Sequence, residues 1–345
     1  MNHKLDIIGI GAINFDFIFP ISPLVDIEFK IGEETFVSEI EFNKFYDTVC
    51  SASKQVYHQI GGSALLALSA LHNCDDSLSC GLVGIYGTPD KKSVNAGFPS
   101  FFEFVSSLSD TINDTSWLLS SAESNGSAIV ALSDNQRAFI KIYPGANTVL
   151  KEVIMMNETN LLRFIEYLKE TRCVHLTSFG DNTQFDFFID CISRAKKTNS
   201  ELIVSIDPGY ENTHSRWDSF RKSFSVLDYL FLNESEYKNL CLHLNGSETK
   251  LLRYIRENGA AKIIVKKRAG ALFIDVNNGT KVLYSHSTID NSEIICDTGA
   301  GDAFAGGFLA GVLNGMDRSE CVRLGGYSAI KVLRKVPLII KRVNI

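Results

Sequence analysis

The sequence predicts a three-layer α/β/α fold with a central, mostly parallel β-sheet and a small β-sheet that forms a lid. From Asn157 to Val265, segments of helical period alternate with short apolar runs, a pattern typical of parallel strands joined by helices. A hairpin pattern covers residues 127–143, and an irregular aromatic stretch covers residues 21–59. We expect both segments to contribute strands to the lid, although the hairpin could instead be an edge of the main sheet.

The bulk composition excludes several classes of protein. The chain has 345 residues, and its 45% hydrophobic content can bury a sizeable core. Its net charge of −6 comes without a long basic cluster, which argues against a nucleic-acid partner. We find no membrane-spanning apolar run and no signal-peptide pattern at the N-terminus. We therefore expect a cytoplasmic location, no membrane association, and eight cysteines present as reduced thiols.

The first predicted strand is a β-branched run at residues 5–12, which suits a buried strand of a parallel sheet. It contains Gly9-x-Gly11, the start of the fingerprint of a dinucleotide-binding oxidoreductase, so this enzyme class is one alternative. Two features weigh against it. Asn14 replaces the third glycine of the fingerprint, and residues 15–23 show no helical period.

The later elements follow from hydrophobic period and from turn residues. A Gly-Gly turn at Gly61 and Gly62 leads into an apolar helical run that ends near Leu71. The other predicted strands cover residues 78–85, 173–177, 202–207, 229–232, 262–266, 271–276 and 281–285, and the other predicted helices cover 101–108, 157–170, 185–197, 234–243, 248–258 and about 318–334.

A polar, glycine-rich turn at residues 297–302 runs straight into another helical pattern. Its glycines let a ligand approach the backbone, and the N–H groups of a first helical turn point outward with the positive end of the helix dipole. This arrangement predicts a phosphate cradle. A carboxylate inside the cradle would repel an anion, so Asp302 indicates catalysis. The alternative is structural: Asp297 caps the helix and Asp302 complements its dipole.

The turn resembles the C-terminal signature of the ribokinase (PfkB) family of sugar and nucleoside kinases, in which Gly-Ala-Gly-Asp opens a long helix. The resemblance implies that Asp302 is the general base and that the backbone of Gly299, Ala300 and Gly301 forms an anion hole. It also implies a ribokinase-like fold for the whole chain. We expect a single kinase domain over residues 1–345, with a lid formed by roughly 14–59 and 115–147.

The resemblance places the acceptor substrate near the first strand and the Gly-Gly turn. The residues implied to bind it are Asn14, Asp16, Gly61, Gly62 and Ser63. An aspartate suits this role because a carboxylate accepts hydrogen bonds from two neighbouring hydroxyls. The alternative for Asp16 is a solvated aspartate in a turn. Leu66 stands where the family usually has an asparagine, which predicts a less polar pocket wall.

On the nucleotide side, the resemblance implies ATP as phosphoryl donor together with Mg²⁺, and a monovalent cation such as K⁺ is a further candidate. Glu236, in an Asn-x-x-Glu motif, would hold the metal through water, whereas the same motif elsewhere usually caps a helix. The turn at residues 265–268 departs from the family pattern. The residues implied to bind nucleotide are Asn233, Thr298, Lys266, Gly270 and Ser328.

We therefore predict an ATP-dependent kinase that phosphorylates a hydroxyl of a small sugar. Two alternatives remain: an adenosine-like nucleoside kinase, and a catalytically weak protein that binds sugar or nucleotide on the same fold. The expected partners are the small-molecule acceptor and ATP. A homodimer formed through the lid is a further expectation.

Overall fold

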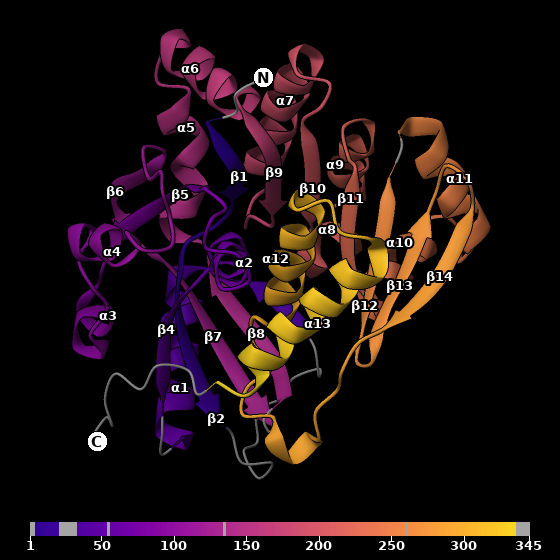
Figure 1. Cartoon of the computed structure of the whole chain (residues 1–345). Helices are drawn as coiled ribbons and strands as arrows, with labels where there is room; N and C mark the ends of the chain where they lie inside the picture. The colour runs from indigo at the N-terminus through magenta and orange to yellow at the C-terminus, as the bar shows by residue number, and fades with distance from the viewer. Residues whose placement is uncertain (1–3, 21–32, 54–55, 134–135, 260, 336–345) are drawn as a thin grey trace.

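The computed structural model describes residues 4–20, 33–53, 56–133, 136–259 and 261–335 (Figure 1). Its larger sheet has nine strands in the order β14-β13-β12-β11-β10-β9-β1-β5-β6. The strands from β6 to β12 pair in parallel, and β13 and β14 add an antiparallel edge. Their bounds are β1 (Leu5–Ile10), β5 (Cys80–Thr88), β6 (Leu118–Ser124), β9 (Thr171–Thr177), β10 (Ile203–Asp207), β11 (Tyr229–Asn233), β12 (Lys262–Lys267), β13 (Gly270–Asp275) and β14 (Thr280–Ser285).

Helices cover both faces of this sheet, as the alternating pattern predicts (Figure 1). One face carries α2 (Ser63–His72), α12 (Ala300–Leu313) and α13 (Arg318–Leu333). The opposite face carries α5 (Leu150–Ile154), α6 (Glu158–Lys169), α7 (Asn182–Thr198), α10 (Glu234–His243) and α11 (Glu248–Asn258). Shorter elements connect them: α3 (Lys91–Ala96), α4 (Phe101–Ser107), α8 (Gly209–His214), α9 (Trp217–Phe220), η1 (Gly145–Val149), η2 (Arg221–Ser225) and η3 (Asn291–Glu293).

Helix α12 lies against its neighbours at short range because its inner face is built from small residues. A Cβ added to Gly306 would stand 2.0 Å from the carbonyl oxygen of Ala67 in α2. Further along α12, Phe308 packs edge-on against Phe231 of β11, with ring centroids 5.3 Å apart. This close packing explains why a helix with three interior glycines is stable despite its low helix propensity.

A second sheet has five strands in the order β3-β8-β7-β2-β4. It comprises β2 (Asn14–Pro20), β3 (Glu33–Phe36), β4 (Tyr57–Gly61), β7 (Gly126–Ser133) and β8 (Gln136–Tyr143). The hairpin predicted around residues 127–143 is therefore a hairpin of this small sheet and not an edge of the main one. The turn residues 134–135 lie outside the described chain.

Two segments predicted for the lid differ from the expectation. Residues Glu39–Ala52 form a helix, α1, inside the stretch from which strands were expected. Ser38 and Glu41 cap it reciprocally, with the Ser38 N–H 2.9 Å from a Glu41 carboxylate oxygen. In the segment 115–147, strand β6 joins the main sheet beside β5, whereas β7 and β8 belong to the small sheet.

Other predicted elements are found close to their expected bounds, and α10 and α11 match them at both ends. Within residues 4–20, β1 leads directly into β2. The fingerprint of a dinucleotide-binding oxidoreductase needs a helix at this point, so the structure does not support that alternative. Among the helices in the described ranges, none combines the length and the apolar character needed to cross a bilayer.

Candidate active site

A cleft of about 980 Å³ opens where the small sheet faces the carboxyl ends of the main-sheet strands and the start of α12. Open α/β sheets bind their ligands at this edge. The cleft brings together residues predicted from widely separated parts of the sequence. Among its lining residues are Asn14, Asp16, Gly62, Ser63, Asn233, Glu236, Lys266, Thr298, Gly299, Gly301 and Asp302.

The start of α12 has the geometry expected of an anion cradle. Gly299 precedes the helix with φ of 82°, a left-handed conformation that favours glycine. Its carbonyl oxygen accepts a hydrogen bond from the Ala303 N–H at 2.9 Å, which closes the first turn. N–H groups at the start of an α-helix have no acceptor within the helix and can bind an anion. Asp302 lies in this first turn and lines the cleft.

Asp16 lies on β2 at the floor of the cleft and is 6% exposed. Its Oδ2 accepts a hydrogen bond from Gln59 Nε2 at 3.2 Å. A Cβ added to Gly61 would stand 2.0 Å from that same oxygen, so the glycine makes room for the carboxylate. Burial is the main cause that raises the pKa of Asp16 to about 7; the Gln59 hydrogen bond opposes this shift and the charge of Asp302 adds to it. Asp16 and Asp302 both line this cleft.

Asn14 is held in place by Asn147, a buried residue that we did not select from the sequence. Asn147 Nδ2 donates to Asn14 Oδ1 at 3.1 Å and to the Pro144 carbonyl at 2.9 Å, and its Oδ1 accepts from the Ile13 N–H at 2.9 Å. These bonds tie residues 144–147 to the start of β2. The Pro-Gly-Ala-Asn sequence of this segment was the available signal, because a buried asparagine needs several partners.

Asn233 and Glu236 cap the start of α10 reciprocally. The Asn233 N–H donates to Glu236 Oε2 at 2.7 Å, and the Glu236 N–H donates to Asn233 Oδ1 at 2.9 Å. The structural alternative for this motif is therefore correct, yet both side chains also line the cleft. Burial raises the pKa of Glu236, and the neighbouring charge of Asp207 raises it further.

Asp207, the last residue of β10, forms an ion pair with Lys266 of β12, with Nζ and Oδ2 2.5 Å apart. Burial by itself would lower the pKa of Lys266, but the charges of Asp207 and Glu236 outweigh it and raise that pKa. Lys266 therefore carries a largely buried ammonium group at neutral pH. The Asp-Pro sequence at the end of a predicted strand was the signal for Asp207.

The remaining predicted site residues lie outside the lining of this cleft. Gly270 pairs with Lys267 and Ser285 inside the sheet. Ser328 donates to the Leu324 carbonyl at 3.1 Å and lines a separate, more apolar cavity of about 710 Å³ between α2, α4 and α13. Ala300 is the first residue of α12. Ser328 thus shares its cavity with Thr298, which also lines the cleft, whereas Gly270 is in the lining of neither.

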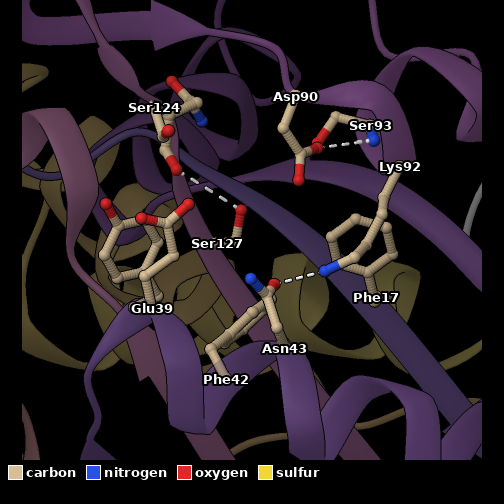
Figure 2. Close-up of a pocket in the computed structure, with 11 residues that line it drawn as sticks. Phe17, Glu39, Phe42, Asn43, Asp90, Lys92, Ser93, Ser124 and Ser127 are labelled. Carbon is tan, nitrogen blue, oxygen red and sulfur yellow. Dashed lines mark hydrogen bonds between the residues drawn. The ribbon is translucent and has the colours of Figure 1, made fainter.

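A third, small pocket lies between α1, α3 and the small sheet (Figure 2). Its volume of about 10 Å³ suits one water molecule and excludes a sugar or a nucleotide. The side chains in it bind one another: Lys92 donates to Asn43, and the Ser93 N–H donates to Asp90 Oδ1 at 2.8 Å. The first bond connects α3 to α1 and the second caps the start of α3, so this pocket has a structural role.

Comparison with known proteins supports the family resemblance of the sequence. The sequence profile described as "pfkB family carbohydrate kinase" matches residues 103–340. The chain belongs to this family. A cytidine kinase from Thermococcus kodakarensis is 33% identical over 172 residues, which cover 49% of this chain and 58% of that protein. An adenosine kinase from Schizosaccharomyces pombe is 23% identical over 332 residues, and the matched region covers 90% of this chain and 93% of that protein.

Solved structures show the same fold. The adenosine kinase from Schistosoma mansoni in complex with 2-fluoroadenosine superposes with a TM-score of 0.79 at 17% identity, covering 96% of this chain and 95% of that one. A probable sugar kinase from Rhizobium etli superposes with a TM-score of 0.72 at 16% identity, covering 99% of this chain and 96% of that one. The ribokinase-like fold predicted for this chain is therefore confirmed.

Proposed function

We propose that this protein is an ATP-dependent kinase that phosphorylates a hydroxyl group of a nucleoside. The observation that carries the proposal is that Asp16 and Asp302 line one cleft together with the glycine turn at the start of α12. One carboxylate can hold the hydroxyls of the acceptor, and the other can take a proton from the hydroxyl that reacts.

In the proposed reaction, the acceptor hydroxyl oxygen forms a bond to the γ-phosphorus of ATP. The bond from that phosphorus to the oxygen bridging the β-phosphate breaks, and its electron pair leaves with ADP. Asp302 takes the hydroxyl proton, and the N–H groups of Gly299 and Gly301 stabilise the phosphoryl oxygens, whereas the Ala300 N–H already donates to the Asp297 carbonyl at 3.2 Å. Since phosphoryl transfer needs little covalent help from the protein, positioning by Asp16 and Asn14 supplies much of the catalysis.

A nucleoside acceptor fits the cleft better than the small sugar that the sequence pattern favoured. The wall beyond Asp16 carries apolar side chains, which suit the flat face of a base better than a fully hydroxylated ring. These side chains are Leu66, Ala128, Val130, Ile140 and Ile142. The relatives include adenosine kinases, a cytidine kinase and a nucleoside kinase, and also an uncharacterized sugar kinase.

The nucleotide end of the cleft fits a divalent cation bound together with phosphate. There, two carboxylates, Asp207 and Glu236, face one ammonium group, Lys266. Within the described ranges, no three His, Cys, Asp or Glu side chains are grouped to hold a metal ion directly. Glu236 would therefore hold Mg²⁺ through water, and the ion would neutralise the β- and γ-oxygens of ATP. A role for K⁺ and a dimer formed through the small sheet stay predictions.

The test is ADP release by the purified protein, with ATP and Mg²⁺, against a panel of nucleosides and sugars. We expect nucleoside-dependent release by the wild type and a loss of at least about 10³-fold in kcat for Asp302→Asn, with nucleotide affinity retained. Retained turnover in Asp302→Asn would contradict the assignment of Asp302 as the general base. Release with sugars alone would favour the sugar kinase, and no release with any acceptor would favour the binding protein.

A further inference from the structure

Lys266 stands apart from its basic neighbours on the same strand. Successive side chains of a strand point to opposite faces. Lys267 therefore points the other way and pairs with Glu234, and Arg268 contacts Asn291. The Lys266 and Asp207 side chains are 15% and 8% exposed, whereas those of Lys267 and Glu234 are 35% and 65% exposed. Lys266 is thus the less exposed of the two lysines and lines the cleft, whereas Lys267 is more exposed and lies outside the cleft lining.

The Lys266 ammonium group lies beside the anion cradle. A Cβ added to Gly301 would stand 3.3 Å from Lys266 Nζ, a distance that reflects how closely the ammonium approaches the cradle backbone. Lys266, Gly301 and Asp302 all line the same cleft. An anion bound on the first turn of α12 would therefore meet an ammonium group as well as N–H groups.

Holding a charge in this place is costly for the fold. Removing lysine and its partner from water needs strong compensation, and such a pair rarely adds stability over an apolar core of the same size. Asp207 is the compensating partner in the structure described, and Glu236 is a second carboxylate nearby. The ammonium group faces the point where Asp302 and the cradle meet, which favours a role in binding a transferred anion over a role in packing.

We infer that Lys266 is a catalytic residue whose ammonium group contacts the γ-phosphoryl group as it passes from ATP to the acceptor. This inference rests on the proposed function. Asp207 is a positioning residue: it holds Lys266 at the cradle until phosphate oxygens replace its carboxylate as the partner. Lys266 keeps its protons throughout, so the balance of the reaction is unchanged, and its charge offsets the negative charge on the three phosphoryl oxygens.

The experiment compares the wild type with Lys266→Met, Lys266→Arg and the double variant Lys266→Met with Asp207→Asn. Lys267→Met is the matched control, because it removes the adjacent lysine from the opposite face. We expect Lys266→Met to lower kcat by about 10²-fold or more, with the KM for the acceptor within about 3-fold. Lys266→Arg should keep about a tenth of the activity or more, and Lys267→Met should match the wild type.

The double variant separates catalysis from folding. It leaves no carboxylate at residue 207, so it should remain folded even where Lys266→Met is unstable. If Lys266 contacts the phosphoryl group, the double variant stays as inactive as the single one. Recovery of wild-type kcat in the double variant, or full activity of Lys266→Met, overturns the inference.

Calorimetric binding of ATP and ADP gives a readout that does not depend on turnover. Lys266→Met should reduce the affinity for ATP at least about 10-fold more than the affinity for ADP, because only ATP carries the phosphoryl group that the ammonium contacts. An equal loss for both nucleotides, or no loss, overturns the inference. A wild type that binds ATP but phosphorylates no acceptor overturns the proposed function instead. In that case, the loss of ATP affinity relative to ADP affinity in Lys266→Met still decides the role of Lys266.

Discussion

Replacing Asp16 should have opposite effects on acceptor binding and on the stability of the fold. In the native protein, burial raises the pKa of this carboxyl group from its ordinary value of 3.8 to about 7. The folded state therefore holds a proton at pH values where the unfolded chain has already lost it. The effect of Asp16 on the free energy of unfolding is absent below pH 3.8. As the pH rises, this effect increasingly lowers the free energy of unfolding, and it is complete once the pH exceeds about 7.

The size of this loss follows from the difference between the two pKa values. At about 1.4 kcal/mol for each tenfold change in the equilibrium constant, it amounts to about 4 kcal/mol at pH 8 and about 2 kcal/mol at pH 5. Asp16→Asn cannot ionise and keeps a side-chain oxygen that can accept from Gln59. We therefore expect Asp16→Asn to be more stable than the wild type by these amounts, while acceptor binding is lost.

Urea unfolding at pH 5 and pH 8 measures the difference through the midpoint and slope of each transition. Asp47→Asn is the control, because Asp47 is an exposed aspartate on α1 outside the cleft lining. It should change stability by less than about 0.5 kcal/mol at either pH. A stabilisation by Asp16→Asn that is the same at both pH values, or a loss of stability at pH 8, would refute the reasoning.

Three further predictions concern the cleft and its support. Acceptor affinity should rise as the pH passes through about 7, because the ionised Asp16 accepts hydroxyl hydrogen bonds; equal affinity at pH 6 and pH 8 would contradict this. Gly61→Ala should weaken acceptor binding at least about 10-fold, because its Cβ would displace the Asp16 carboxylate 2.0 Å away, and titration of the acceptor measures this. Gly306→Ala should lower the free energy of unfolding by about 2–3 kcal/mol, because its Cβ would stand 2.0 Å from the Ala67 carbonyl, and an unchanged melting temperature would be inconsistent with that packing.

The elements with a strong local pattern were predictable from the sequence, and α1 shows where the prediction was incomplete. Its apolar residues Phe42, Phe45, Tyr46 and Val49 have helical spacing, and its Ser38–Glu41 capping pair was visible. The surrounding aromatic residues outweighed this signal and favoured strands. The assignment of β6 was also incomplete, since pairing with β5 depends on contacts that a local pattern does not contain.

The sequence by itself determined the glycine turn proposed to be catalytic, because Gly299, Gly301 and Asp302 lie within four residues and their chemistry follows from the start of a helix. The tertiary structure decided what surrounds that turn. Lys266 and Asp207 are 59 residues apart in the chain, and parallel strands β10, β11 and β12 bring them within 2.5 Å of each other. The raised pKa of Asp16 likewise comes from burial and from Asp302. Charge interactions depend on distance and burial in three dimensions, which hydrophobic period and motif spacing do not specify.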